Sequence, residues 1–306
     1  MVDQRHKVDF FIVGAARSGT TSLYQYLSQH PDVFLPKVKE LNYFSQVTSS
    51  EPKDYENPKP GREYHTKIIQ SPEVYTGLFS GATPNQISGD ISPSYLWHPE
   101  TAKALYKHNP EAKIIVTLRH PVQRAFSHYL MAKSVGYDRS PNFEQAIKAP
   151  LSKHWGGGNR YLEWSDYLAP MQAYFHCFPL AQIHVMIFEQ WIGHQEQAMA
   201  DLAYFLGIEH QSTIALGDQH NQTIAYKHQG VLNALRLPWA RTLLHRLLSE
   251  SQRTRLKGVL FGAQAADEIL ADELKESLMQ DQRQNIEQLE ALTGQPLPVI
   301  WGLKPS

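Results

Sequence analysis

Four short runs of apolar residues predict strands that are buried on both faces of a sheet. They cover residues 10–13, 86–89, 113–118 and 183–188. The segments between them space their apolar residues at helical intervals, which predicts a helix in each. These helices cover about 20–29, the stretch after His98, the stretch from Pro121, and 198–206, which Gly207 ends. Strands that alternate with helices of this length predict βαβ units and a parallel sheet.

The rest of the chain contains polar loops and a helical C-terminal part. Residues 45–63, 156–158 and 209–222 are polar or glycine-rich and predict loops. From about Val231 onward, leucines at helical spacing predict helices. No internal repeat and no clear linker interrupt the sequence, so we expect one domain with helical additions.

Composition narrows the class of protein. The chain has 306 residues, of which 42% are apolar and 19% charged, so it can bury a substantial core. A net charge of −1 argues against a dedicated nucleic-acid-binding protein. The single cysteine, Cys177, excludes an intrachain disulfide and a zinc site built on several thiolates. Together with the polar N-terminus and the lack of any apolar run of about 18 residues, it predicts a cytoplasmic protein without a membrane span.

The segment from Gly14 to Ser22 carries the strongest chemical signal. It follows a predicted strand and opens a predicted helix, a geometry that directs backbone N–H groups and the positive end of the helix dipole at an anion. Its spacing is that of a nucleotide P-loop, but Thr20 stands where the P-loop has lysine. Arg17 carries the positive charge instead, which suits transfer of a terminal group without a triphosphate. A glycine-rich turn that binds no ligand is the alternative.

This segment resembles the 5′-phosphosulfate loop of sulfotransferases that use 3′-phosphoadenosine 5′-phosphosulfate (PAPS). The stretch Arg119-His-Pro-Val-Gln-Arg124-Ala-Phe-Ser127 resembles the 3′-phosphate motif of the same family, with His120 in place of Asp or Asn. The resemblance implies that Arg119 and Ser127 bind the 3′-phosphate. The residues agree, because Arg119 ends a predicted parallel strand and Ser127 lies about two helical turns on. We expect Arg124 to be a structural ion-pairing residue.

The segment Lys39-Glu40-Leu-Asn-Tyr-Phe44 resembles a motif of the glycan (heparan-type) sulfotransferases. That resemblance implies that Glu40 is the catalytic base and that Lys39 lies near the reacting sulfate. An acceptor hydroxyl needs such a base, and apolar neighbours predict a raised pKa for Glu40 through partial desolvation. His65 is the rival base, and a surface Lys–Glu pair without catalytic function is the structural alternative.

The likeness covers most of residues 8–302 and implies an α/β, P-loop-like three-layer fold with a central parallel sheet flanked by helices. It implies one sulfotransferase domain over 1–306, with a cofactor-binding core at 8–130, substrate-side loops at 45–70 and 150–160, and a helical part at 231–302. The residues implied to hold the 5′-phosphate are Arg17, Ser18, Gly19, Thr20, Thr21 and Ser22. Lys227 falls where relatives carry a loop that closes over the nucleotide, and 92–95 resembles a substrate-cleft segment.

The expected activity is in-line transfer of a sulfuryl group from PAPS to a hydroxyl or amine, with PAP (3′-phosphoadenosine 5′-phosphate) as product and no metal. The acceptor is a glycan, a lipid or a small metabolite, and the sequence predicts no nucleic-acid partner and no particular oligomeric state. A P-loop kinase that uses ATP is the alternative, with Asp90 as its only candidate for a magnesium-binding aspartate. A nucleotide-binding module without catalysis is the third.

Overall fold

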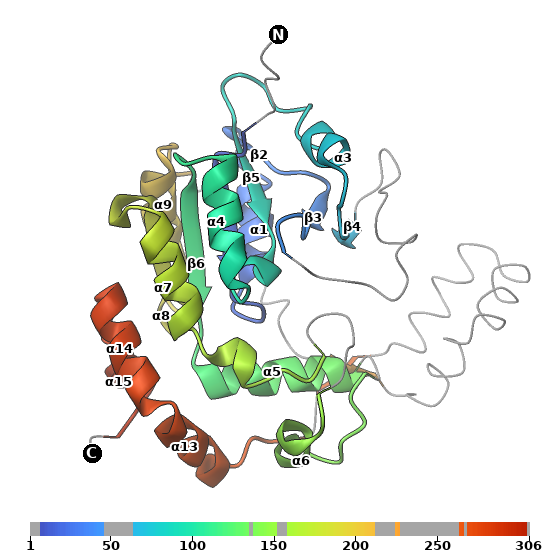
Figure 1. Cartoon of the computed structure of the whole chain (residues 1–306), viewed down its shortest axis with the longest axis vertical. Coiled ribbons are helices and arrows are strands. Elements are labelled where there is room, and N and C mark those ends of the chain that lie inside the picture. The colour runs from blue at the N-terminus through green and yellow to red at the C-terminus, as the bar shows by residue number, and fades with distance from the viewer. Residues whose placement is uncertain are drawn as a thin grey trace, which may run out of the picture.

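The computed structural model describes residues 7–45, 64–134, 137–151, 158–211, 224–226, 263–265 and 268–304. Five strands form a parallel central sheet (Figure 1). Their order across the sheet is β2 (Val33–Phe34), β5 (Ile87–Ile91), β1 (Phe10–Gly14), β6 (Lys113–Leu118) and β7 (Ile183–Ile187). The predicted parallel sheet is therefore confirmed, and β1 lies at its centre.

Alternate residues of β1 pack on opposite faces of the sheet, which gives the three layers. Phe10 and Ile12 join a core with the helices α1 (Thr20–Leu27) and α9 (Gln195–Leu206). Phe11 and Val13 join the core on the other face, with α4 (Pro99–His108) and α7 (Leu168–Cys177). The expected fold of a parallel sheet flanked by helices is confirmed.

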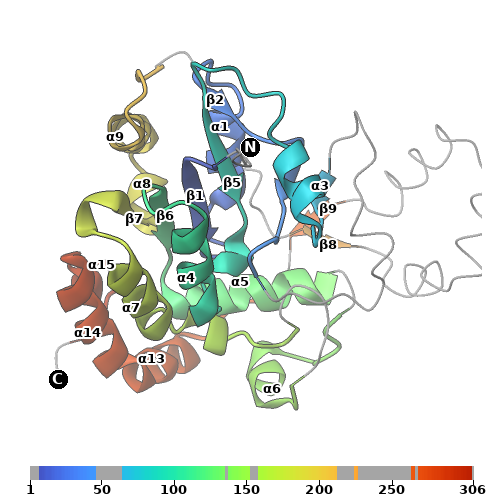
Figure 2. The ribbon, with the colours of Figure 1, turned by 45° about the horizontal axis from the view of Figure 1, so that its top comes forward.

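Further elements surround this core (Figure 2). The long helix α5 (Pro121–Ser134) follows β6, and the C-terminal helices α13 (Asp272–Asp281), α14 (Arg283–Thr293) and α15 (Leu297–Ile300) pack beside α5 and α7. Two small sheets pair β3 (Val38–Glu40) with β4 (Tyr64–Thr66), and β8 (Ile224–Tyr226) with β9 (Ala263–Ala265). The other helices of the described residues are α3 (Pro72–Gly77), α6 (Phe143–Lys148), α8 (Phe188–Trp191) and the 3-10 turns Pro93–Tyr95, Glu163–Ser165 and Leu180–Gln182.

Several element boundaries differ from the prediction by one to three residues, among them the end of α1 at Leu27 instead of about 29. Strand β5 runs over Ile87–Ile91 rather than 86–89, β7 ends at Ile187 because α8 begins at Phe188, and α9 begins at Gln195 instead of 198. Part of the predicted loop at 45–70 is a strand, because Tyr64–Thr66 pairs with β3. Most of the predicted loops at 45–63, 150–160 and 209–222, and the leucines of 231–260, lie outside the described residues. Within the described ranges, no helix is long and apolar enough to cross a bilayer.

Candidate functional site

The turn between β1 and α1 forms an uncapped helix N-terminus. Gly19 occupies the cap position with a φ of 88°, no side chain caps the helix, and its first turn holds no acidic residue. The first N–H groups of a helix have no partner within it and can bind an anion. In this turn the Ser18 N–H already donates to the carbonyl oxygen of Ala15 at 3.3 Å and the Ser22 N–H to that of Gly19 at 3.0 Å, so the amides between them are the ones available. Glycine is required at position 19, since an added Cβ would stand 2.2 Å from Cζ2 of Trp191.

Arg17, Arg119 and Ser127 meet beside this helix end. The Nε of Arg17 donates to Oγ of Ser127 at 3.1 Å, and Nη1 of Arg119 donates to the carbonyl oxygen of Arg17 at 3.0 Å. Arg17 holds a left-handed φ of 70°, an unusual conformation for a residue with a side chain. The structure thus joins residues that the sequence separates by about a hundred positions, as the two motifs predicted.

The two guanidinium groups lack a carboxylate partner among the described residues. Burial, together with the charge of Arg119, lowers the pKa of Arg17 to about 10, although Glu40 raises it in part. Burial also lowers the pKa of Arg119, although the charge of Glu189 raises it in part. The Nε of Arg119 is buried without a hydrogen-bond partner in the described part of the chain. Arg119 stacks over the ring of Phe188, with 4.8 Å from Cζ to the ring centroid. Two neighbouring guanidinium groups of this kind can bind a dianion.

Residues far along the chain brace the turn after β6. Tyr167 donates its hydroxyl to the carbonyl oxygen of Arg119 at 3.0 Å. Glu189 accepts from the backbone N–H of His120 at 2.9 Å and from Nε1 of Trp301 at 3.2 Å. Burial lowers the pKa of His120 to about 4, so its imidazole is neutral near pH 7. These contacts fix the direction of Arg119.

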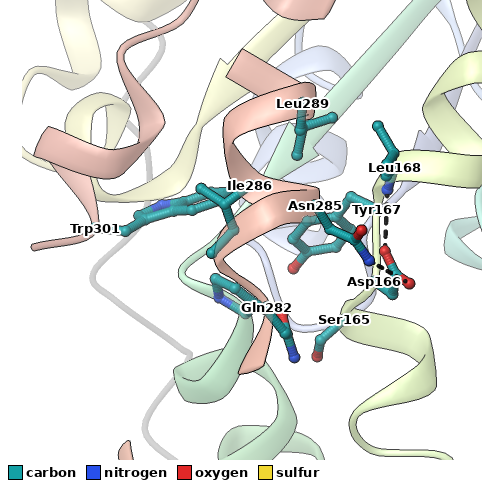
Figure 3. A pocket seen from close by; sticks show the side chains of 10 residues that line it. Ser165, Asp166, Tyr167, Leu168, Gln282, Asn285, Ile286, Leu289 and Trp301 are labelled. Carbon is teal, nitrogen blue, oxygen red and sulfur yellow. Dashed lines mark hydrogen bonds between the residues drawn. The ribbon is translucent and has the colours of Figure 1, made fainter. Parts of the chain in front are cut away.

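A pocket adjoins this bracing and encloses about 190 Å³, part of it open to solvent. Figure 3 shows Tyr167 and Trp301 in its wall, with Asn285 of α14 directed at Asp166. The Nδ2 of Asn285 donates to Oδ2 of Asp166 at 3.1 Å. The pocket therefore lies between α14 and Tyr167, the residue whose hydroxyl contacts the backbone of Arg119.

Arg124 corrects one expectation. Its side chain is fully buried, and it forms hydrogen bonds without an ion pair among the described residues: Nε donates to Ser165 Oγ at 2.7 Å, and Nη2 to the carbonyl oxygen of Tyr161 at 2.7 Å. Its Nη1 also reaches the carbonyl oxygen of Ala16 at 3.4 Å. Arg124 is structural, as expected, but neutral acceptors satisfy it instead of a carboxylate.

Glu40 is the last residue of strand β3, and its carboxylate lies beside the side chains of Lys39 and His65. Its Oε1 accepts from Nζ of Lys39 at 2.8 Å and lies 3.4 Å from Nε2 of His65 on β4. Lys39 is buried, with 4% of its side chain exposed, so the pair is not the surface pair of the structural alternative. Burial raises the pKa of Glu40, but Lys39 and His65 outweigh it and lower the pKa to about 2. The predicted raised pKa is wrong in direction, because a buried ammonium stands next to the carboxylate.

The other predicted residues fall into three groups. Ser18 is buried with no partner for Oγ among the described residues, while its carbonyl oxygen accepts from Thr117 Oγ1 at 2.8 Å. Thr20, Thr21 and Ser22 form the first turn of α1. Lys227 lies outside the described residues.

Sequence reasoning assigned no contact at this site to several residues that support it, because they lie far from the two motifs along the chain. Trp191 donates Nε1 to Thr117 Oγ1 at 3.0 Å and thereby supports the carbonyl contact to Ser18. Tyr167, Glu189 and Trp301 reach the site only through the fold of the chain.

The carboxylate of Asp90 is not free to bind a magnesium ion. Both carboxylate oxygens accept hydrogen bonds from hydroxyls, those of Ser92 at 2.7 Å, Tyr95 at 2.7 Å and Tyr75 at 3.1 Å. Within the described part of the chain, no three His, Cys, Asp or Glu side chains gather as a metal site would need. The kinase alternative thus loses its only candidate aspartate.

Comparison with known proteins places these contacts in context. The model of a family described as the sulfotransferase family matches residues 9–212. A crystal structure of a sulfotransferase from Alicyclobacillus acidocaldarius aligns with 96% of this chain and 98% of its own, at 26% identity and a TM-score of 0.68.

Curated relatives match over shorter stretches. Membrane-associated sulfotransferase kil1 of Dictyostelium discoideum is 34% identical over 121 residues, which are 40% of this chain and 22% of that protein. Heparan sulfate glucosamine 3-O-sulfotransferase 5 of mouse and of human is 26% identical over 179 residues, 57% of this chain and 46% of the relative. The chain therefore spans less than half the length of these relatives.

Proposed function

The chain belongs to the sulfotransferase family, and we propose that it transfers a sulfuryl group from PAPS to an acceptor hydroxyl or amine. One observation supports this most strongly. Two partly buried guanidinium groups, Arg17 and Arg119, lie at the carboxyl ends of adjacent strands without a carboxylate partner in the described residues, beside an uncapped helix N-terminus. An adenosine that carries phosphate at both the 5′ and 3′ positions supplies the two missing anions.

The proposal assigns one phosphate to each half of this site. The amides between Ser18 and Ser22 and the hydroxyls of Thr20, Thr21 and Ser22 would hold the 5′-phosphate at the start of α1. Arg119 and Ser127 would hold the 3′-phosphate. The Oγ of Ser127 accepts a hydrogen bond from Nε of Arg17, so one hydrogen bond joins the two proposed phosphate sites. We keep Lys227 as a further proposed contact to the nucleotide.

PAPS, when bound, supplies the sulfuryl group and a stable phosphate leaving group. Glu40 would take the proton of the acceptor as the acceptor oxygen bonds to sulfur, and it is ionised near pH 7 because Lys39 and His65 lower its pKa. Arg17 would offset the charge that the departing 5′-phosphate oxygen gains when the sulfur–oxygen bond breaks. Lys39 would offset the charge on the equatorial sulfuryl oxygens.

The acceptor is the finer part of the proposal. Relatives are named for glucosamine in heparan sulfate, which favours a sugar hydroxyl. A panel of heparan sulfate, an alkyl glucoside, a long-chain alcohol and a primary amine separates glycan, lipid and amine acceptors. Transfer of ³⁵S from labelled PAPS identifies the class that reacts. We also keep one domain and a cytoplasmic location as predictions.

Titration calorimetry with PAP and with ATP plus Mg²⁺ tests the donor. PAP should bind without a divalent ion, and ATP with Mg²⁺ should bind weakly, because Thr20 replaces the lysine that bridges the β- and γ-phosphates. Tight ATP binding with no response to PAP would overturn the proposal in favour of a kinase. Binding of PAP with no ³⁵S transfer to any acceptor, in the wild type and in Glu40→Ala alike, would favour a module without catalysis.

A further inference from the structure

A buried carboxylate on the central sheet is linked through two hydroxyls to the turn that follows Glu40. Asp90 on β5 is 1% exposed. Its Oδ1 accepts from Ser92 Oγ at 2.7 Å, and its Oδ2 accepts from the hydroxyl of Tyr95 at 2.7 Å. None of these three residues belongs to the anion site or to the proposed acid–base group.

The two hydroxyls in turn accept from consecutive backbone amides. Ser92 Oγ accepts from the N–H groups of Leu41 at 2.9 Å and Asn42 at 3.1 Å. The hydroxyl oxygen of Tyr95 accepts from the N–H of Tyr43 at 3.0 Å and, at 3.5 Å, from that of Phe44. The four residues directly after Glu40 are therefore all held by one carboxylate through two intermediaries.

We call the path from Asp90 through the Ser92 and Tyr95 hydroxyls to the four amides the relay. The charge of Asp90 decides in which direction the hydroxyls donate. An ionised carboxylate can only accept, so each hydroxyl must point its proton at Asp90 and its lone pairs at the turn. The turn needs such support, because Asn42 takes a left-handed φ of 53°. Burial raises the pKa of Asp90 to about 6, so the ionised form is costly to keep and three hydroxyl donors stabilise it.

We propose that Asp90, acting through Ser92 and Tyr95, is the positioning residue that orients Glu40 for proton transfer. The proposal rests on the proposed function of Glu40 as base. Glu40 itself makes no contact with Asp90, but its carbonyl oxygen accepts from Lys67 N at 2.8 Å on one side of the chain, and the relay holds the four amides on the other. A displacement of the base by about 1 Å can cost roughly a hundredfold in rate.

The chain offers a matched pair of variants that separates positioning from simple stabilisation. Tyr95→Phe removes a hydroxyl that links Asp90 to the turn. Tyr75→Phe removes another hydroxyl that donates to the same Asp90 oxygen, at 3.1 Å, but among the described residues no backbone amide donates to the Tyr75 hydroxyl. Both rings are fully buried, and both substitutions take one donor from the same carboxylate.

Hydrogen exchange tests the relay without any need for turnover. The amides of Tyr43 and Phe44, which donate to the Tyr95 hydroxyl, should exchange faster in Tyr95→Phe than in Tyr75→Phe, with both variants compared at equal distance below their melting temperatures. Equal exchange in the two variants overturns the proposal. If Tyr95→Phe does not fold, Ser92→Ala replaces it, with faster exchange expected at Leu41 and Asn42, and unchanged exchange there overturning the proposal.

Turnover then tests the effect on Glu40. We measure PAP release from PAPS with the acceptor of the panel that reacts fastest. Tyr95→Phe and Asp90→Asn should lower kcat by about 10- to 100-fold, while the KM for PAPS and the affinity for PAP stay unchanged and Tyr75→Phe keeps the wild-type kcat. An unchanged kcat in Tyr95→Phe, or an equal loss in Tyr75→Phe, overturns the positioning function. A wild type that binds no PAP refutes the proposed function instead, and the exchange experiment still decides whether the relay exists.

Discussion

Arg17 combines three features at the residue scale: a left-handed backbone, a partly buried guanidinium and no carboxylate partner in the described structure. Residues held in such conformations cluster at functional sites. We therefore expect Arg17→Ala to lower kcat by roughly 10²- to 10³-fold, the usual cost of removing one group that stabilises developing charge. Arg17→Lys keeps the charge and should lose much less. Steady-state release of PAP measures both, and an equal loss in the two variants would count against a charge role.

The choice between Glu40 and His65 as base is a second question about single residues. Glu40 is largely buried and ionised, whereas 63% of the His65 side chain is exposed. We expect Glu40→Gln to lower kcat by roughly 10²- to 10⁴-fold and His65→Asn to have a small effect. The matched measurement is kcat for both variants with the same acceptor. A collapse of turnover in His65→Asn, with Glu40→Gln nearly as active as wild type, would make His65 the base.

The same pair of residues gives a pH dependence of stability whose sign can be worked out. The folded pKa of Glu40 is lowered from 4.5 to about 2, so its stabilising contribution is complete above the unfolded pKa and is lost as the pH falls through the folded one. Glu40→Gln leaves the buried Lys39 without its carboxylate and should reduce the free energy of unfolding by about 3 kcal/mol at pH 7.

Urea unfolding of wild type and variant at several pH values checks this. The difference between them should stay constant down to about pH 5, close to where a glutamate titrates in an unfolded chain, and should shrink below it. The exposed Lys148–Glu144 pair provides the control, since Glu144→Gln should change stability little at any pH. A difference that grows on acidification would contradict the lowered pKa.

The sequence correctly predicted some features of the candidate site and not others. It predicted that Arg17, Arg119 and Ser127 lie together, because each sits in a motif whose position relative to a strand end is fixed locally. The pKa of Glu40 was predicted in the wrong direction, because the apolar neighbours were visible in the sequence but the burial of Lys39 was not.

At the scale of elements, periodicity identified the long buried strands and failed on the short ones. Strands β1 and β6 are apolar on both faces and are found where predicted. Strands β3 and β4 have three residues each, too few to display a period, and they pair across a gap of more than twenty residues. Yet Glu40 and His65 lie on these two strands, so the proposed base and its rival depend on elements that only the structure reveals.

The C-terminal helices support the proposed 3′-phosphate site through the carboxylate of Glu189, and this contact leads to a prediction at the scale of elements. Glu189 on α8 ties the backbone of His120 to Trp301, the residue after α15. Trp301→Phe keeps an aromatic ring but removes the indole N–H, so the turn at Arg119 should loosen. We expect the affinity for PAP to fall by about three- to tenfold, the value of one such hydrogen bond.

Titration calorimetry with 5′-AMP provides the internal control for this variant. That nucleotide lacks the 3′-phosphate, so its affinity should be the same in wild type and Trp301→Phe. A loss shared equally by PAP and 5′-AMP would mean that the helices stabilise the whole fold and not the 3′-phosphate turn.

At the scale of the whole molecule, the site lies where the order of strands reverses. The chain passes from β1 to β2 and β5 on one side of the sheet, then crosses to β6 and β7 on the other, so the loops after β1 and β6 diverge from neighbouring strand ends. Open α/β sheets bind ligands at such a point. A ligand with two phosphates would bridge these loops and join two halves of the sheet that the chain itself connects only through long crossovers.

This arrangement predicts that PAP stabilises the entire fold and that the effect needs both halves of the site. At a concentration one hundred times its dissociation constant, PAP should raise the free energy of unfolding by about 2.7 kcal/mol. In Arg119→Ala at the same concentration, a hundredfold loss of affinity would leave a gain of only about 0.4 kcal/mol. Thermal unfolding with PAP, 5′-AMP and ATP plus Mg²⁺ measures these gains in one experiment. Because 5′-AMP would bind only at the start of α1, it should stabilise wild type and Arg119→Ala to the same small extent. Full stabilisation of Arg119→Ala by PAP would mean that the 3′-phosphate binds elsewhere, and it would contradict the proposed role of the motif after β6.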